Sequence, residues 1–242
     1  MNHYLNATAV AVLATTLGLP TLAAEFSVTP VRIFMAAKDR AVAITVANEG
    51  DEEVVMQADL YLWKQKPDGE DELTLTEDLI LSPPIIKLAP KSRQVVRLAR
   101  ISAQPAAGQQ TYRMIVREIP EARPASKDLK LQIALAFSLP VFITPPGAKR
   151  ELVCTTQRTA ADAVSVACEN RGNAYAQPRE FTLVAENGQK IASRDSGGYI
   201  LPDIKRSFEI KREDGKIPAG RAKLQVALDD GTLQTFEAAL AE

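Results

Sequence analysis

The stretch that decides the fold is residues 128–144, with the sequence DLKLQIALAFSLPVFIT. Large apolar side chains stand at every second position from Leu129 to Ile143, and the positions between them are polar or small up to Ser138. Since successive side chains of a β-strand point to opposite faces, this period of two predicts a strand with one apolar face. The fifteen residues from 129 to 143 would span ~50 Å, well beyond the usual length of a strand.

Pro140 interrupts the hydrogen bonding of this predicted strand. Proline has no backbone N–H with which to donate a hydrogen bond to a neighbouring strand. This part of the strand is therefore expected at a sheet edge or a bulge, not between two paired strands. A long apolar edge is an aggregation hazard unless another element covers it. Alternation by itself favours an apolar face that lies in the core of this chain's own sandwich. If no other element covers the edge, the strand is expected instead to pair with a strand of another protein.

The rest of the chain also alternates with a period of two, and turn residues such as Gly, Asp, Asn and Pro bound the alternating segments. Further strands are predicted at 41–48, 54–63, 94–98, 112–116, 181–185, 207–210, 222–228 and 235–240. No segment has the period of a long amphipathic helix. Short alternating strands with frequent turns predict an all-β chain of sandwich type.

The alternation breaks at residues 144–147, with the sequence TPPG, and a second strand-rich region follows. A chain of 242 residues, 46% of them hydrophobic, can bury the cores of two ordinary domains. We therefore predict one sandwich over residues 25–146 and a second over 147–242, joined by a stiff Pro-Pro segment.

The first 24 residues contain no Lys, Arg, Asp or Glu, and an apolar run lies between Ala9 and Leu19. This run is too short to span a bilayer. Because it is followed by Pro20 and small residues, segment 1–24 is predicted to be a secretory signal peptide, although the usual basic start is missing. A buried N-terminal helix is the alternative. No other stretch approaches eighteen apolar residues, so membrane insertion of the mature chain is not expected.

The two cysteines, Cys154 and Cys168, fit an exported protein. Folding residues 151–158 back on 164–170 about a turn at 159–163 places the two cysteines directly opposite each other and pairs Thr156 with Val166. One disulfide is therefore predicted, with a stabilisation of roughly 3 kcal/mol in the chain-entropy account. Two free buried thiols are the alternative.

Composition argues against several functional classes. Lys plus Arg number 29 against 30 Asp plus Glu, so charge gives no reason to expect nucleic-acid binding. The single histidine, His3, lies in the predicted signal segment, which leaves the mature chain without a Ser-His-Asp triad, a Cys-His pair or a mixed His/Cys zinc site. No enzyme activity, cofactor or metal is expected. A carboxylate-based hydrolase is the weakest alternative, because no paired Asp/Glu motif stands out.

The ordered combination of several short motifs resembles the periplasmic pilus chaperones of the PapD type. The motifs are SPPIIKLAP at 82–90, QVVRL at 94–98, YRMIVREIP at 112–120, LQIAL at 131–135 and LPVF at 139–142, with NRGNA at 170–174 in the second half. The resemblance covers nearly all of 25–146. It implies two immunoglobulin-like domains in a boomerang arrangement, which hold pilus subunits in the periplasm and pass them to an outer-membrane usher.

The resemblance also implies a donor strand. A pilus subunit lacks its last strand and exposes a groove, which the last strand of the chaperone's first domain fills with alternate large residues. The candidates are Leu131, Ile133, Leu135, Phe137 and Leu139, and one sequence does not fix which of them enter. Self-capping of the free chaperone into a homo-oligomer is a further expectation. A secreted adhesin or ligand-binding sandwich, which would cover this edge, is the alternative function.

Members of this family anchor the subunit's C-terminal carboxylate with basic side chains between the domains. In the PapD branch these are an Arg of the first strand, matched here by Arg32, and a Lys whose position is taken by Pro140. The Tyr112–Arg113 pair and the LPVF ending resemble the archaic branch, where an Arg after this Tyr takes the carboxylate. We therefore expect Arg113 as the anchor, followed by Arg32 and then Arg117, each with a solvated surface arginine as the alternative.

Two features receive structural interpretations. Trp63, with Tyr61 and Leu60, is expected to be core and boundary packing rather than a carbohydrate platform. The Pro83–Pro84 segment is a place where the family suggests a cis peptide bond, while X-Pro base rates favour trans.

Overall fold

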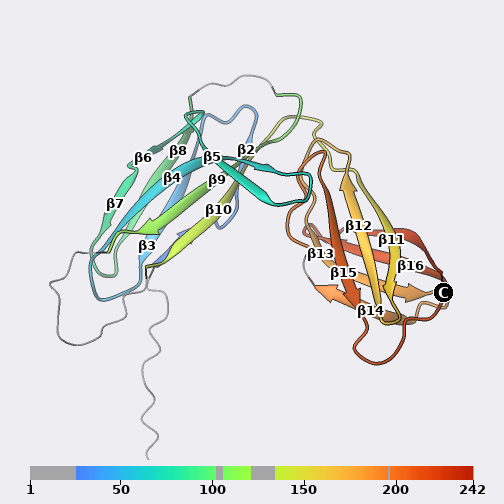
Figure 1. Ribbon diagram of the computed structural model, residues 1–242. Helices are drawn as coiled ribbons and strands as arrows, with labels where there is room; N and C mark the ends of the chain where they lie inside the picture. The colour runs from blue at the N-terminus through green and yellow to red at the C-terminus, as the bar shows by residue number, and fades with distance from the viewer. Residues whose placement is uncertain (1–25, 102–105, 121–133, 196, 242) are drawn as a thin grey trace, which may run out of the picture.

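The computed structural model describes residues 26–101, 106–120, 134–195 and 197–241. Every regular element in these ranges is a β-strand, and the strands form two bodies that meet at an angle (Figure 1). No helix of the described residues is long and apolar enough to cross a membrane. The predicted all-β architecture of two sandwiches is confirmed.

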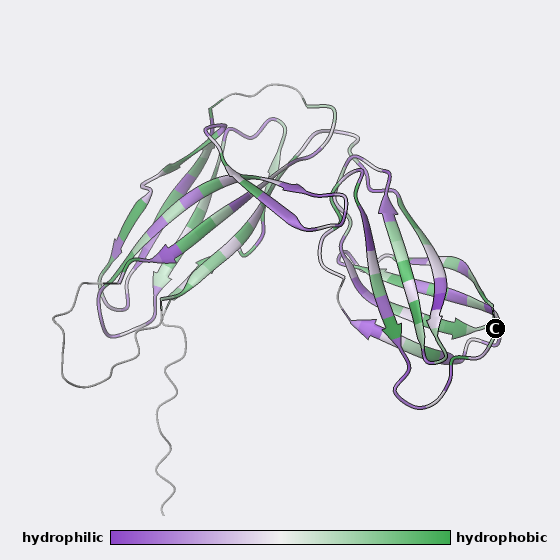
Figure 2. Cartoon of the chain, in the orientation of Figure 1, coloured by the Kyte–Doolittle hydropathy of each residue, from purple (hydrophilic) through white to green (hydrophobic). Residues whose placement is uncertain are grey.

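The first domain contains two packed sheets. Its strands are β1 (Phe26–Thr29), β2 (Ile33–Ala36), β3 (Ala41–Asn48), β4 (Val54–Gln65), β5 (Asp71–Leu75), β6 (Leu79–Ser82), β7 (Ile85–Leu88), β8 (Arg93–Arg100), β9 (Gln110–Glu118) and β10 (Ala136–Thr144). One sheet has the order β1-β3-β8-β6; the other has the order β2-β10-β9-β4-β5, with β7 also paired to β4. Apolar and polar side chains alternate along these strands (Figure 2), so each sheet turns one apolar face to a shared core.

Strand β10 begins at Ala136, later than the strand predicted from the sequence. Ala134 and Leu135 are described and lie outside any strand, so the prediction was wrong there, and residues 129–133 lie outside the described residues. Along its full length β10 pairs with β9, and Pro140 lies opposite Arg113. On its other side β10 pairs with β2 only from Val141, which lies opposite Ile33 in a parallel register. Among the described strands, nothing else pairs with 136–140 on that side. The predicted edge position of Pro140 is confirmed, and this segment, 136–140, is called the open edge below.

The second domain also contains two sheets and a core of its own. Its strands are β11 (Leu152–Ala160), β12 (Ala163–Asn170), β13 (Pro178–Ala185), β14 (Lys190–Asp195), β15 (Lys205–Lys211), β16 (Gly220–Leu228) and β17 (Leu233–Leu240). One sheet has the order β11-β12-β15 and the other β14-β13-β16-β17.

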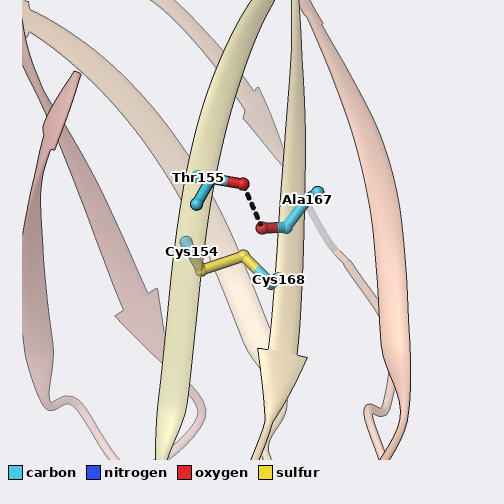
Figure 3. The surroundings of a disulfide bond; sticks show 4 residues. All are labelled: Cys154, Thr155, Ala167 and Cys168. Atoms are coloured by element: carbon cyan, nitrogen blue, oxygen red, sulfur yellow. Dashed lines mark hydrogen bonds between the residues drawn. A yellow bond between two sulfur atoms is a disulfide. The ribbon is translucent and has the colours of Figure 1, made fainter. Parts of the chain in front are cut away.

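The disulfide predicted from the sequence is present in this domain. Cys154 and Cys168 lie opposite each other on β11 and β12, and their sulfurs are bonded at 2.00 Å (Figure 3). Thr156 lies opposite Val166 in the same register, as predicted. The Ser82–Pro83 peptide bond, which the sequence left open, is cis.

Candidate binding site at the domain junction

A third apolar cluster, separate from the two sandwich cores, joins the domains. Trp63 and Phe142 contribute the first domain's share, and Tyr175 and Tyr199 come from loops of the second. The Phe142 ring stacks on Tyr175 with centroids 4.2 Å apart, and Trp63 meets Tyr199 edge-on at 5.2 Å. Trp63 is only 1% exposed. The packing interpretation of Trp63 is therefore confirmed, and the cluster sets how the two domains meet.

Hydrogen bonds between the domains reinforce this cluster. The Gln65 side chain donates to the carbonyl oxygen of Tyr199 at 3.1 Å and accepts from the N–H of Leu201 at 2.9 Å. The backbone N–H of Gln109 also donates across the junction, to the carbonyl of Asn173 at 2.8 Å. These contacts pair polar groups that are buried or partly buried where the domains meet.

The face of the β2–β5 sheet that is turned away from the core carries the candidate arginines. Arg113 on β9 has Tyr61 and Pro140 as its cross-strand neighbours, so the three side chains share one face. Extending the β2–β10 register by one residue from the pair of Ile33 and Val141 places Arg32 beside Pro140. The two best candidates from the sequence thus flank Pro140, where the open edge ends.

Arg113 is a largely buried cation with a weak partner. Its guanidinium carbon lies 3.8 Å over the Trp63 ring and 5.5 Å from the Tyr199 ring, which is a cation–π arrangement. Its side chain is 13% exposed, and the nearest carboxylate oxygen, on the more exposed Asp71, lies 3.5 Å away. Burial lowers the pKa of Arg113, and Asp71 opposes this only in part. The side chain remains charged and is suited to a second, closer carboxylate.

Arg32 is already engaged across the domain junction. Its Nη1 atom donates to Asp229 at 2.6 Å and to Gln177 at 3.3 Å. Burial lowers the pKa of Arg32, but the hydrogen bond to Asp229 and nearby charges outweigh burial and raise it overall. The Tyr175 hydroxyl donates to the same Asp229 oxygen at 3.0 Å. Burial, followed by the Asp229 charge, raises the pKa of Tyr175, which keeps this donor protonated.

Arg117 lies four residues after Arg113 on β9, on the same face of the sheet and near the other end of the strand. It pairs with Asp59 at 2.5 Å and donates to the Tyr61 hydroxyl at 3.2 Å. The hydrogen bond that Arg117 donates to Tyr61, and the charge of Asp59, raise the pKa of Arg117. Its position, exposed and already paired, fits a surface ion pair of small energetic value.

The donor residues predicted from the sequence fall into three groups. Leu131 and Ile133 lie outside the described residues. Leu135 and Phe137 are half-buried against the first domain's core, where Phe137 meets Phe26 edge-on at 4.8 Å. Leu139 is 4% exposed inside that core. In the free chain this side chain therefore packs in its own domain, and which of the five residues enter a partner's groove stays a prediction.

Comparison with known proteins decides the family. The sequence profile described as pili and flagellar-assembly chaperone, PapD N-terminal domain, matches residues 25–149. The chain belongs to this chaperone family. No curated protein matches the chain at a significant level.

Solved structures with the same fold include other chaperones of pilus assembly. The chaperone–tip adhesion subunit pre-assembly complex CsuC–CsuE, from the archaic Csu pili of Acinetobacter baumannii, contains a chain that matches with a TM-score of 0.63 and 20% identity, over 90% of this chain and 100% of that chain. The CupB2 chaperone of Pseudomonas aeruginosa matches with a TM-score of 0.56 and 17% identity, over 89% and 100%. The complex of the SafA pilin with the SafB chaperone from Salmonella enterica matches with 0.57 and 15%, over 89% and 96%. At these identities the likeness shows the fold.

Sequence reasoning missed the residues with which the second domain contacts the first at the junction, above all Asp229, Tyr175 and Gln177. Asp229 follows β16 in an Asp-Asp-Gly stretch, which by itself indicates only a turn. Its partner Arg32 is 197 positions away, and no local pattern signals such a contact. Among the described residues, no three His, Cys, Asp or Glu side chains gather where they could hold a metal ion.

Proposed function

We propose that this chaperone binds a pilus subunit at the open edge of β10, supplies the strand that the subunit lacks, and delivers the subunit to an outer-membrane usher. The observation that carries the proposal is the open edge itself, which ends beside Arg113. An unpaired edge offers N–H and C=O groups to an extended chain. An adhesin with no strand to accept would be expected to cover this edge.

The register of β2 indicates how an added strand would end. β2 occupies the edge of β10 from Val141 onward and runs parallel to it. A partner strand on the open edge, running in the same direction, would end beside Pro140. Its terminal carboxylate would then lie between Arg113 and Arg32.

Arg113 is the better anchor of the two. Its planar guanidinium can grip a carboxylate through two hydrogen bonds, and its resident partner, Asp71, is distant and 43% exposed. The position of Pro140, together with this use of Arg113, supports assignment to the archaic branch. Loss of one member of a desolvated charge pair typically costs about 2–5 kcal/mol of binding free energy.

The donor side chains in this proposal are Leu131, Ile133 and Leu135, with Phe137 at the boundary of the chaperone's own core. The predicted signal segment and the Cys154–Cys168 disulfide support function in the oxidising periplasm. A second copy of the chain is the other occupant expected for the open edge when no subunit is present.

The test is co-expression in a bacterial periplasm with the pilus subunits of the organism that makes this chaperone, followed by co-purification. Arg113→Ala is expected to remain folded and to lose the subunits. The matched control is Arg97→Ala, which removes the same charge from an exposed position on β8, in the other sheet. Equal subunit yield from the wild type and the Arg113 variant would contradict the anchor, and no subunit capture by the wild type would contradict the function.

A further inference from the structure

The pair of Arg32 and Asp229 gives the two arginines beside Pro140, Arg32 and Arg113, different roles. We propose that Asp229 reserves Arg32 as a clasp between the domains, so that Asp229 determines which arginine receives the partner's terminal carboxylate. Arg113 receives it, and Arg32 does so only when Asp229 is removed. This inference rests on the proposed function, because it concerns the same terminal carboxylate.

The surroundings of Asp229 explain why it keeps Arg32. The residue sits in the tight turn between β16 and β17, and its N–H donates to the carbonyl of Gln177 at 3.0 Å. Its side chain is 6% exposed. One oxygen accepts from Arg32 and Tyr175, while the other is buried without a hydrogen-bond partner and has Arg150 at 3.9 Å. A buried carboxylate in this position depends on its cation, because an unpaired buried charge is strongly unfavourable.

Competition between carboxylates then favours Arg113. An incoming carboxylate at Arg32 would share one guanidinium with Asp229, and two carboxylates at one site repel each other. At Arg113 the resident carboxylate is Asp71, which lies 3.5 Å away and is 43% exposed. Asp71 can turn into water at small cost, because exposed ion pairs are weak. Both arginines are one strand away from Pro140, so an unengaged Arg32 could serve the same carboxylate.

The experiment compares subunit capture by Arg113→Ala, Arg32→Ala, Asp229→Asn and the double variant Arg113→Ala/Asp229→Asn in periplasmic co-expression. We expect Arg113→Ala to lose capture and Arg32→Ala to retain most of it. The double variant should recover at least tenfold more subunit than Arg113→Ala, since Asn carries no charge and releases Arg32. Adding Arg32→Ala to the double variant should abolish this recovery.

Either of two results would overturn the proposal: a folded Arg32→Ala variant that loses capture as fully as Arg113→Ala, or a folded double variant no better than Arg113→Ala. If the variants with Asp229→Asn do not fold, two other results test the proposal: subunit capture by Arg32→Ala, and an NMR measurement on the wild type. Guanidinium NMR signals of ¹⁵N-arginine-labelled chaperone should shift for Arg113, and not for Arg32, between the free protein and the co-purified complex. The reverse pattern would refute the division of roles while leaving the chaperone function standing; capture of no subunit by the wild type would remove both.

Discussion

Replacing Phe142 with Ala removes the ring on which the two domains meet. Phe142 is fully buried and stacks on Tyr175 at 4.2 Å, with Tyr199 at 5.7 Å and Trp63 at 6.0 Å. It belongs to the junction cluster and to neither sandwich core. The substitution should therefore weaken the contact between the domains and leave each domain's own core filled.

Truncating a buried Phe to Ala typically costs about 3–5 kcal/mol. A stacked aromatic pair contributes about 0.5–1.5 kcal/mol beyond the area that it buries. Because the cavity opens between two bodies that can shift to refill it, we expect a loss near the lower end, ~3 kcal/mol. This loss should reduce the free energy of contact between the two domains and not the stability of either sandwich core.

Trp63, the chain's single tryptophan, lies in this junction and reports on it directly. Denaturant unfolding of Phe142→Ala, followed by Trp63 fluorescence and by far-UV circular dichroism, should show the fluorescence transition before the loss of β-structure. In the wild type the two transitions should coincide. Phe34→Ala is the control, because this ring also stacks on Phe142, at 5.6 Å, but is 51% exposed. Coincident transitions in the Phe142 variant would refute the reasoning.

Two further predictions separate donor residues from core residues and test acid stability. Ile133→Asp should abolish subunit capture and leave the melting temperature nearly unchanged. Leu139→Asp should lower the free energy of unfolding by several kcal/mol, because it places an unpaired carboxylate in the core. Thermal melts of both variants check this, and equal melting temperatures would contradict it. Hydrogen bonds from Arg150 and from the backbone of Thr232 lower the pKa of Asp230 to about 2. The ionised group therefore stabilises the fold fully above its unfolded pKa near 3.8. This stabilisation is lost as the pH falls toward 2. Melting temperatures of Asp230→Asn between pH 5 and about 2 should therefore fall less steeply than those of the wild type, and parallel curves would refute this.

The fold was predictable where side-chain alternation is strong. Strands such as β3 and β10, and the pairing of Cys154 with Cys168, follow from local period and turn position. Six shorter strands were not predicted: β1, β2, β5, β6, β7 and β14. All five residues of β5 are exposed, so the strand has no apolar face for a pattern to reveal.

The site was predictable only in part. The period of two puts Leu139 and Leu131 on the same face, and it cannot show that Leu139 fills its own domain. The family's motif directed attention to Arg113, but its contacts with Trp63 and Tyr199 depend on how two domains meet. Asp229 carried no local signal because its role arises from a contact between the ends of the chain.

Pro140 has a consequence for the kind of chain that can bind. Beyond this residue the edge of β10 is already occupied by β2, so a segment taken from the middle of another polypeptide would collide with β2 as it continued. In the parallel orientation proposed above, a chain that terminates beside Pro140 can pair with the whole of the preceding edge without meeting β2. In the proposed binding mode, β2 therefore limits how far a bound subunit strand can extend. Extra residues after the last strand of a subunit are expected to weaken its capture, independently of the charges at Arg113 and Arg32.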